Sequence, residues 1–238
     1  MSDATRAEVA VIACAELFRG DGEILASPMG LIPSLGARLA RLTFEPDLLL
    51  TDGEACLVTD SAVEGWQPFR KVLDTVVPHG KRHVVMGANQ IDRHGNQNIS
   101  AIGDHTRPKK QLLGMRGAPG NTVNHRTSYW VPRHSRRVFV DEVDVVCGVG
   151  FERARDAGVE RFHDLHRVVT NLGVLDLRPD GIRLLSVHPG VSVDDVVENT
   201  TFELDVTQAV ETRLPSAEEL HLLRDVLDPK SLRDKEVR

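Results

Sequence analysis

Three short stretches of the chain combine glycine with polar side chains, and each follows an apolar run. They are TDGE (51–54), GANQIDRHGNQN (87–98) and GVGF (148–151). Carboxylates, amides and closely approachable glycine backbone are groups that can hold and polarise a small polar ligand. We therefore take these stretches as the first candidates for a binding or catalytic site.

The side-chain amides of the middle stretch can serve two purposes. Amides carried beyond a strand end either satisfy buried backbone groups or reach a ligand carbonyl, and both roles stay open for Gln90 and Asn98. Asp92, His94 and Gly95 also suit a plain turn, because Asp folds back on its own backbone and glycine accepts positive φ. We expect Gln90 and Asn98 to contact substrate.

A further polar segment, GMRGAPGNTVNHRTSYW (114–130), mixes glycines with charged and aromatic residues. Its glycines allow close backbone approach, and its N–H groups could stabilise an oxyanion. Arg126 offers a two-pronged donor for a carboxylate, and His125 could act as an acid, a base or a hydrogen-bond donor. A surface loop with two aromatics tucked into the core is the plain alternative. The predicted oxyanion or thioester residues are Gly114, Gly117, Gly120 and Asn121, and the predicted substrate-binding residues are Asn124, His125, Arg126, Tyr129 and Trp130.

Helices and strands that must position these residues can be read from hydrophobic spacing and caps. The pattern predicts helices at 4–19, 34–42, 192–199 and from 216 onward, the first of them amphipathic. The last helix is expected to bury Leu220, Leu223, Val226 and Leu227. Strands are expected at 48–50, 82–88, 137–140, 143–150, 167–178 and 181–190.

Strands that are apolar on both faces and alternate with helices predict an α/β fold. The expected architecture is an open, largely parallel sheet covered by helices. Ligands of such sheets bind at the carboxyl ends of the strands. Since 51–54, 87–98 and 148–151 all follow expected strands, we expect the three stretches to meet at one edge of the sheet.

Composition sets further bounds. The 238 residues, of which 41% are hydrophobic, fit a single domain over 1–238 with a charged tail at 229–238 that is solvated or rests on a partner. A net charge of −6 with one tyrosine and two tryptophans gives no broad surface for nucleic acid. No apolar run has the length of a membrane span, and the acidic N-terminal helix is unlike a signal peptide, so we expect a cytoplasmic protein without membrane association.

Metal and disulfide chemistry are not expected. Three widely separated cysteines suggest neither a disulfide framework nor a zinc site. His163 and His166 have no obvious partner ligands, and structural roles suit them better.

The segment GANQIDRHGNQN resembles a segment of the beta subunits of family I coenzyme A transferases. So do, in the same order along the chain, LARLTFEPDLLLTDGEA, RRVFVDEVDVVCGVGF, VVTNLGVLDL, HPGVSVDDVVENTTFEL and ETRLPSAEELHLLRDVLDP. The resemblance implies a CoA transferase-like fold, an acyl-CoA substrate and an alpha subunit as partner, in a heterodimer or an α2β2 heterotetramer. Coenzyme A would be present as part of the substrate thioester, with no other cofactor.

The chain departs from the transferase pattern just after PDLLL. Transferases of this family carry a glutamate there, and its carboxylate becomes a covalent acyl carrier. Aligned without a gap, this chain has Asp52, one methylene shorter, and Glu54 lies two residues further on. A displacement of about 1 Å can slow a reaction about a hundredfold, so neither carboxylate simply replaces the glutamate. A capped strand end with solvated carboxylates is the alternative for both.

Together with this departure, the segments TDGEA and RGAPGNTVNHRTSYW resemble those of a group of enzymes with the CoA transferase-like fold. Enzymes of that group hydrolyse a ring carbon–carbon bond in a steroid-derived CoA thioester. The resemblance implies that the alpha subunit supplies the acid or base, and that this chain supplies walls, anion contacts and oxyanion donors. We predict a beta subunit of such a hydrolase. The alternatives are a true transferase that uses Glu54 or Asp52 covalently, and a non-catalytic subunit that completes the alpha-subunit site.

Overall fold

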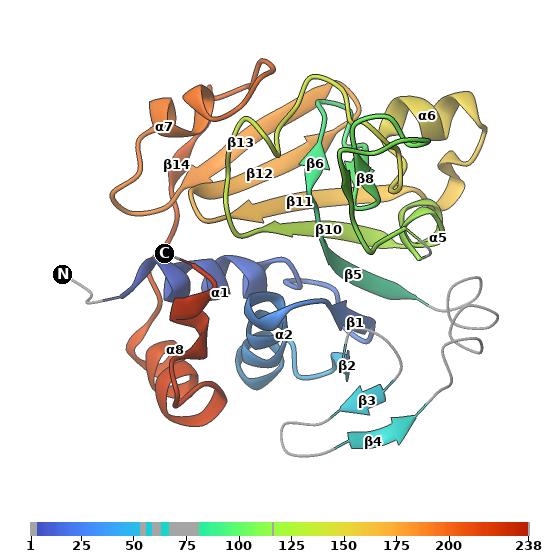
Figure 1. The fold of residues 1–238 in the computed structure, drawn as a ribbon. Coiled ribbons are helices and arrows are strands. Elements are labelled where there is room, and N and C mark those ends of the chain that lie inside the picture. The colour runs from blue at the N-terminus through green and yellow to red at the C-terminus, as the bar shows by residue number, and fades with distance from the viewer. Residues whose placement is uncertain (1–3, 53–55, 59–62, 67–80, 116, 238) are drawn as a thin grey trace.

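The computed structural model describes residues 4–52, 56–58, 63–66, 81–115 and 117–237 (Figure 1). Its centre is a ten-stranded sheet in the order β14-β13-β12-β11-β10-β5-β1-β2-β3-β4. These strands are β1 (Leu25–Pro28), β2 (Leu49–Thr51), β3 (Cys56–Val58), β4 (Val63–Trp66), β5 (Arg82–Gly87), β10 (Arg126–Val131), β11 (Asp164–Thr170), β12 (Gly173–Arg178), β13 (Gly181–Val187) and β14 (Val210–Glu211). Two short hairpins lie apart from the sheet, and they are β6 (Gln90–Ile91) with β7 (Gln97–Asn98), and β8 (Ala101–Ile102) with β9 (Lys110–Gln111).

The central strands run parallel. β1 pairs in parallel with β2 and β5, and β10 pairs in parallel with β5 and β11. Antiparallel pairs extend this centre on both sides, through β12 and β13 on one and through β3 and β4 on the other. The expected largely parallel sheet is confirmed, and the strands expected at 82–88, 167–178 and 181–190 are present as β5, the β11-β12 hairpin and β13.

Helices and loops cover both faces of the sheet. On one face lie α1 (Arg6–Glu16), α2 (Leu31–Thr43), α8 (Ala217–His221), the π-helical η3 (Leu222–Leu227) and the 3₁₀ turn η4 (Leu232–Lys235), drawn in blue and red in Figure 1. The other face carries α5 (Ala118–Asn124), α6 (Phe151–Asp156), α7 (Val193–Glu198) and the 3₁₀ turn η2 (Glu160–Phe162). Val85 and Trp130 belong to the first core, and Val84, Met86 and Tyr129 belong to the second. Successive strand residues therefore alternate between the two cores.

Helix α1 is buried on all sides instead of being amphipathic. Almost every residue from Ala7 to Ala15 is shielded from solvent. The small side chains of α1 let α2 approach closely, because a Cβ added at Gly36 would lie only 2.7 Å from the Cβ of Cys14. None of the helices in the described ranges is long and apolar enough to cross a bilayer.

Residues 137–150 do not form the two strands that were expected there. They run as turns, with single bridges from Phe139 to Ile91 and from Gly148 to Gln97. Asp141 and Glu142 interrupt the apolar residues and are exposed. Those two residues lie between the expected strands, and the exposed Asp144 lies within the second one. A strand buried on both faces could not accommodate the Asp144 carboxylate, so the segment buries its apolar side chains one at a time.

The set of residues that the last helix was expected to bury is wrong at one position. Leu223 is buried, but Val226 is 56% exposed. The cause is the π-helical segment Leu222–Leu227, whose wider turn rotates later side chains relative to an α-helix.

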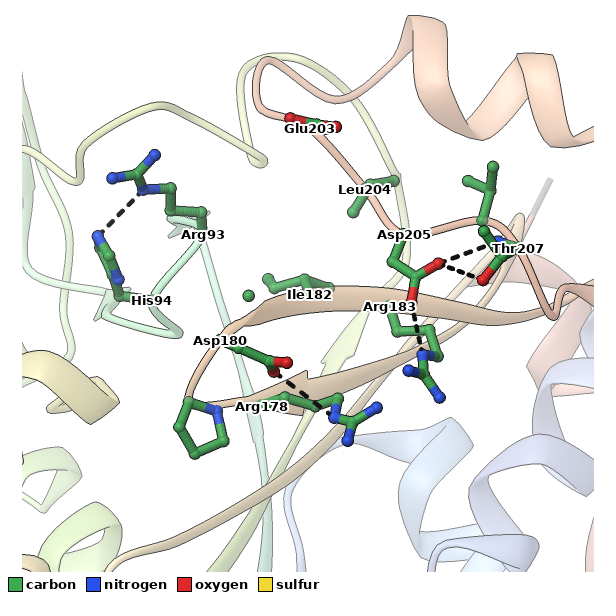
Figure 2. Close-up of a pocket in the computed structure, with 13 residues that line it drawn as sticks. Arg93, His94, Arg178, Asp180, Ile182, Arg183, Glu203, Leu204, Asp205 and Thr207 are labelled. Carbon is green, nitrogen blue, oxygen red and sulfur yellow. Dashed lines mark hydrogen bonds and ion pairs between the residues drawn. The ribbon is translucent and has the colours of Figure 1, made fainter.

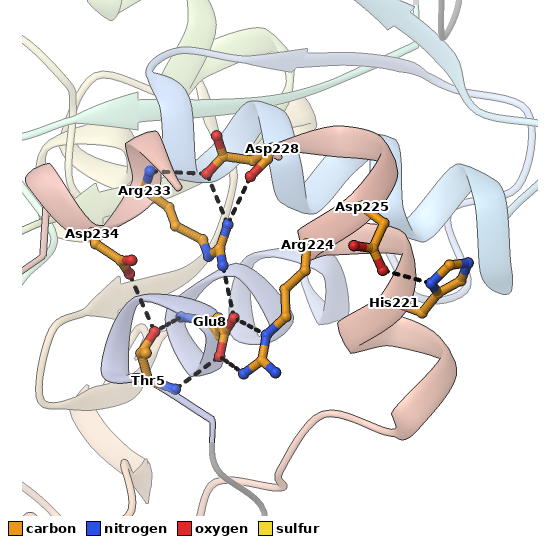
Figure 3. Close-up of polar contacts among 8 residues, drawn as sticks. All are labelled: Thr5, Glu8, His221, Arg224, Asp225, Asp228, Arg233 and Asp234. Atoms are coloured by element: carbon orange, nitrogen blue, oxygen red, sulfur yellow. Dashed lines mark hydrogen bonds and ion pairs between the residues drawn. The ribbon is translucent and has the colours of Figure 1, made fainter. Parts of the chain in front are cut away.

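The segment that follows α8 is fixed to α1 by buried ion pairs (Figure 3). The Glu8 carboxylate accepts hydrogen bonds from Arg224 Nε at 2.7 Å and from Arg233 Nη2 at 2.8 Å. Arg233 Nη1 also donates to Asp228 Oδ2 at 3.0 Å. The tail was expected to be solvated or to rest on a partner, yet its Arg233 and Val237 are buried against this chain.

These contacts keep Glu8 ionised. Burial alone would favour the neutral acid, but hydrogen bonds from Arg224, the Thr5 N–H and Arg233 outweigh it and lower the pKa of Glu8 from 4.5 to about 2. The carboxylate thereby links α1 to two arginines from the C-terminal part of the chain.

Replacing Glu8 by Gln should destabilise the fold strongly. The change removes the charge that compensates two arginines, and breaking a buried ion pair typically costs about 3–5 kcal/mol. Urea unfolding at pH 7 would measure the loss. Asp225→Asn is the matched control, because its partner His221 is exposed and such surface pairs contribute about 0–1 kcal/mol. Equal losses in the two variants would contradict this role of Glu8.

The contribution of Glu8 should also depend on pH. Its folded pKa lies below the unfolded value of 4.5, so the folded state binds fewer protons through this group. Its stabilisation is fully present above pH 4.5 and declines as pH falls toward about 2. The difference in unfolding free energy between wild type and Glu8→Gln should narrow over that interval. A constant difference from pH 6 to pH 3 would show that the pKa is not lowered.

Candidate active site

A chain of polar side chains crosses the sheet from β2 to α5. Thr51, the last residue of β2, donates its hydroxyl to Ser27 Oγ on β1 at 3.2 Å. Ser27 Oγ also accepts from Arg82 Nε on β5 at 2.7 Å, and Arg82 Nη1 donates to Asn121 Oδ1 on α5 at 2.9 Å. All four residues are buried. They join three neighbouring parallel strands to a helix that covers the sheet.

Arg82 is the charged member of this cluster. It is only 5% exposed, and burial lowers its pKa to about 10, so it is still a cation at neutral pH. Its two hydrogen-bond partners are neutral, and no carboxylate of the described residues forms an ion pair with it. Asn121 Nδ2, next to it, donates only to Met86 Sδ at 3.3 Å, a weak acceptor.

The sequence predicted a role for Asn121 but missed Ser27 and Arg82. One signal was available for Arg82, because it opens the apolar run RHVVM with the same facing as Val84 and Met86. An arginine at that position of a strand buried on both faces must lie under a covering element. Its partners on β1 and α5 could not be read from the sequence.

The two predicted carboxylates follow Thr51 directly. Asp52 is exposed, and its Oδ1 accepts a hydrogen bond from the Cys56 N–H at 3.0 Å. The Asp52 N–H donates to the Cys56 carbonyl at 3.0 Å, so the residue ties the end of β2 to the start of β3. This geometry matches the capped strand end that was considered for Asp52. Glu54 lies outside the described residues.

The amides of 87–98 are engaged within the chain. Gln90 Nε2 donates to Asp144 Oδ2 at 3.0 Å, and Gln90 Oε1 accepts from Asn98 Nδ2 at 2.7 Å. Asn98 Oδ1 accepts from the Ser100 N–H at 2.9 Å. In this structure the two amides satisfy buried groups of the chain itself, which is one of the two roles that the sequence left open. Their contact with substrate stays a prediction.

The segment between β6 and β7 is the turn that the sequence allowed for Asp92, His94 and Gly95. Asp92 Oδ1 accepts from the N–H groups of His94 and Asn96, and Gly95 has a φ of +81°. The signature segment therefore builds a tight hairpin.

Two of the three polar stretches meet. The Gly150 N–H donates to Asn96 Oδ1 at 2.8 Å, and a Cβ at Gly150 would lie 2.6 Å from the His94 carbonyl oxygen. Gly148 forms a bridge with Gln97. The glycines of 148–151 are thus needed for close packing against 94–97. Thr51 belongs to β2, which β1 separates from β5, so Thr51 and Asp52 do not take part in this contact. Residues 53 and 54 lie outside the described residues.

The predicted oxyanion glycines have structural contacts. The Gly114 N–H donates to the Ile99 carbonyl at 3.0 Å, and a Cβ there would lie 2.6 Å from Ile99 Cδ1. In this conformation the Gly114 N–H is occupied by the Ile99 carbonyl, and the oxyanion role of Gly114 stays a prediction. The carbonyls of Gly117 and Gly120 accept from the Asn121 N–H and from Asn124 Nδ2. Their own N–H groups stay candidates.

Arg126 and His125 lie at the amino end of β10. Arg126 donates from Nε to Asp164 at 2.9 Å and from Nη1 to Asp21 at 3.0 Å, so two carboxylates already compensate its charge. His125 is the C-cap of α5 and is buried. The predicted pairing of Arg126 with a substrate carboxylate stays a prediction.

Tyr129 and Trp130 lie on opposite faces of the sheet, and their predicted contact with substrate stays a prediction. They are neighbours on a strand, so Tyr129 points into one core and Trp130 into the other. Burial, with the nearby Asp92, raises the pKa of Tyr129 well above its usual value. Trp130 Nε1 donates to Glu236 Oε1 at 2.6 Å, which ties β10 to the C-terminal segment.

A second polar network resembles a catalytic triad. His83 Nδ1 lies 2.6 Å from Asp21 Oδ2, and His83 Nε2 lies 2.9 Å from Ser128 Oγ. The carboxylate favours the proton on Nδ1, which leaves Nε2 to accept from the serine hydroxyl. Ser128 and His83 are both 0% exposed. The network is therefore part of the core of this chain.

Two clefts open elsewhere. One of about 630 Å³ lies between the β12-β13 turn, Arg93 and residues 203–207 (Figure 2). Its charges are largely paired, with Arg183 at 2.8 Å from Asp205. The other, of about 480 Å³, is lined by Asp92, Glu152 and their neighbours. Neither contains any of the predicted site residues, and the described ranges hold no His, Cys, Asp and Glu group suited to a metal ion.

Comparison with known proteins decides the family. The coenzyme A transferase family model matches residues 75–199. The chain is 58% identical to the cholesterol ring-cleaving hydrolase IpdB subunit of Rhodococcus jostii strain RHA1, over 100% of this chain and 98% of that protein. The chain belongs to the coenzyme A transferase family. It is also 56% identical to the IpdB subunit of Mycobacterium tuberculosis strain H37Rv, over 98% of this chain and 99% of that one.

A solved structure agrees with this assignment. The crystal structure of Rhodococcus jostii RHA1 IpdAB matches the chain with a TM-score of 0.93 at 57% identity, and the match covers 100% of both chains. The coenzyme A transferase fold that the sequence motifs implied is thus confirmed. In a coenzyme A transferase family chain, the Thr51–Ser27–Arg82–Asn121 cluster beside Asp52 is the part of the described structure that best suits a site.

Two predicted amides can be separated by substitution. Asn98→Ala should destabilise the fold by about 1–3 kcal/mol, because it removes the buried hydrogen bonds of Asn98 with Gln90 Oε1, the Ala101 carbonyl and the Ser100 N–H. Asn124→Ala, the matched control, removes one half-buried bond to the Gly120 carbonyl and should cost about 1 kcal/mol or less. Thermal and urea unfolding would measure both losses. An Asn98→Ala protein with unchanged stability would contradict the structural role.

Proposed function

We propose that this chain is the beta subunit of a heteromeric hydrolase that opens the last steroid ring during cholesterol degradation. The substrate is a cyclohexenone-type carboxyl-CoA, and the reaction is hydrolytic carbon–carbon cleavage. The observation that carries the proposal is the identity of 58% and 56%, over essentially the whole chain, to two proteins named as cholesterol ring-cleaving hydrolase IpdB subunits.

The proposed enzyme contains an alpha subunit as well. The structural relative is named IpdAB, a name that joins an A and a B component, and this supports a heterodimer or an α2β2 heterotetramer. Coenzyme A enters as part of the substrate, and the proposed reaction needs no other cofactor. We place the complex in the cytoplasm.

The chemistry follows from the bond to be broken. A carboxylate of the alpha subunit removes a proton from water, and the oxygen adds to the ring ketone. Collapse of that adduct breaks the ring carbon–carbon bond and leaves a new carboxylate, while the electron pair moves onto the carbon next to the thioester. The thioester carbonyl delocalises that charge as an enolate, which then takes up the proton. The thioester bond itself is conserved.

This chain contributes the environment for the developing negative charge. Fixed donors lower a barrier most when they are already oriented and shielded from water. Asn121 and Arg82 are such donors beside the end of β2, and both are held by hydrogen bonds to the sheet. Asp52 is occupied with the Cys56 N–H, which favours water over a covalent carboxylate of this residue as the attacking group.

Isotope labelling tests the proposal. The complex with its alpha subunit should convert the steroid-derived thioester in H₂¹⁸O to a product with labelled oxygen in the new carboxylate and with CoA still attached. Hydroxylamine should trap no acyl group on Asp52 or Glu54, and Asp52→Asn should keep turnover within about tenfold. Loss of a true nucleophile costs far more.

One outcome would contradict hydrolysis, and another would contradict the proposed contribution of this chain. Transfer of CoA to an added carboxylate such as acetate, together with an acylated Asp52 or Glu54, would establish a transferase. The alpha subunit can also be assembled with a double variant of this chain, Asn121→Ala with Arg82→Met. If ring cleavage continues unchanged in that complex, the beta subunit has only a scaffold role.

A further inference from the structure

Two arginines of this chain are buried to almost the same extent but have different surroundings. Arg233 is 3% exposed and donates to the carboxylates of Asp228 and Glu8, at 3.0 and 2.8 Å. Arg82 is 5% exposed and donates to Ser27 Oγ and Asn121 Oδ1, both neutral. Arg82 is thus a buried cation that no carboxylate of the described residues compensates.

Neutral hydrogen bonds orient a guanidinium but do not cancel its charge. Moving a cation out of water is strongly unfavourable unless an anion accompanies it. Burial disfavours the charged form of Arg82, yet the group stays protonated at neutral pH. Its charge is therefore carried in the interior, where an anion brought next to it would be strongly attracted.

The free edge of the guanidinium defines the shape of that anion. Arginine has five N–H donors, of which Nε uses one on Ser27 and Nη1 uses one on Asn121. The remaining N–H groups of Nη1 and Nη2 lie side by side on one edge. Such an edge matches the two oxygens of a carboxylate.

The cluster that holds Arg82 is rigid. Ser27 is fixed in turn by Thr51, whose hydroxyl also donates to the Ala26 carbonyl at 3.2 Å. Asn121 is held through its backbone, since its N–H donates to the Gly117 carbonyl at 3.0 Å. A guanidinium fixed from two sides is already oriented for a ligand, which reduces the entropy cost of binding.

We propose that Arg82 is the anion-binding residue of this site and that its ligand is a carboxylate. The inference rests on the proposed function in taking that carboxylate either from the acyl-CoA substrate or from the alpha subunit. In both cases Ser27 and Asn121 position the guanidinium, and Arg82 makes the contact.

The test uses the complex of this chain with its alpha subunit, carrying Arg82→Met or Arg82→Lys. Methionine removes the charge at similar length, and lysine keeps the charge but loses the two-pronged edge. Arg82→Met should lower kcat/KM about ten- to a hundredfold, the range expected for charge-assisted hydrogen bonds. Arg82→Lys should show a smaller loss, and it keeps the test valid if the methionine variant does not assemble.

Arg233→Met is the matched control for removing a buried arginine. It should lower the melting temperature of the complex, because it leaves Glu8 and Asp228 uncompensated. Its kcat/KM per folded complex should stay unchanged. A loss of kcat/KM in the control equal to that of Arg82→Met would overturn the assignment, because the effect would then come from the fold.

The two sources of the carboxylate give different results. If the carboxylate belongs to the substrate, an analogue with a carboxamide in its place should react with wild type at a lower kcat/KM than the natural substrate does. This loss should equal the loss that Arg82→Met causes with the natural substrate. The variant and the analogue together should lose no more than either change alone. If the carboxylate belongs to the alpha subunit, Arg82→Met should weaken assembly ten- to a hundredfold instead. Turnover and assembly both within twofold of wild type would overturn the proposal.

Failure of the proposed function can be recognised separately. Calorimetry compares the binding affinity of the complex for succinyl-CoA, which carries a free carboxylate, with that for butyryl-CoA, which carries none. The comparison measures a preference for a carboxylate without any cleavage. A complex that cleaves no steroid thioester, but whose preference or assembly depends on Arg82, would refute the hydrolase and support the Arg82 assignment. A complex with Arg82→Met that cleaves the thioester and assembles as well as wild type would support the hydrolase and refute the Arg82 assignment.

Discussion

The central parallel strands are buried on both faces over most of their length, so most polar side chains on them need a partner inside the protein. The buried Tyr129 Oη has no such partner among the described residues. Water is not available to satisfy such groups, and each unmet donor or acceptor costs free energy. The protein meets this constraint with a few connected networks. One joins Asp21, His83 and Ser128, and another joins Thr51, Ser27, Arg82 and Asn121. Because these networks cross between strands, they fix the order of the sheet as well as the positions of their own atoms.

The two networks differ in the way they balance charge. Asp21 faces His83 and Arg126, so its negative charge meets basic groups at 2.6 and 3.0 Å. The network at Arg82 ends in neutral oxygens. The triad-like network of Asp21, His83 and Ser128 is therefore buried and balanced in charge. The uncompensated charge lies at Arg82, where the chemistry is proposed. Hydrogen-bond geometry taken without charge and access would have pointed to the wrong site.

Much of the fold could be predicted from the sequence, because its signals are local. The Ser192 and Ser216 caps predicted α7 and α8, and the two-faced apolar runs predicted the parallel centre of the sheet. The turn chemistry of Asp92 and Gly95 was equally readable. The failures have physical reasons. Residues 137–150 resemble strands in composition but are broken by exposed acids, and Val226 turns outward because η3 is a π-helix.

The site was harder to predict than the fold, because it depends on contacts between distant parts of the chain. Residues 124–130 are neighbours in sequence, but strand alternation separates Tyr129 from Trp130, and Arg126 lies at the amino end with two acids. The opposite holds for Ser27, Arg82 and Asn121, which are far apart in sequence and adjacent in space. Family motifs identified the fold and the branch, while the partners of each polar atom became visible only in three dimensions.

The connection of Glu8 to Arg224 and Arg233 has a consequence for synthesis in the cell. Domains generally fold as units during translation, and N-terminal elements emerge from the ribosome first. Here the first helix carries a carboxylate whose partners are translated more than two hundred residues later. Until that segment emerges, the Glu8 carboxylate lacks Arg224 and Arg233, its partners in the folded protein. The order of synthesis and the order of packing are thus opposed in this protein.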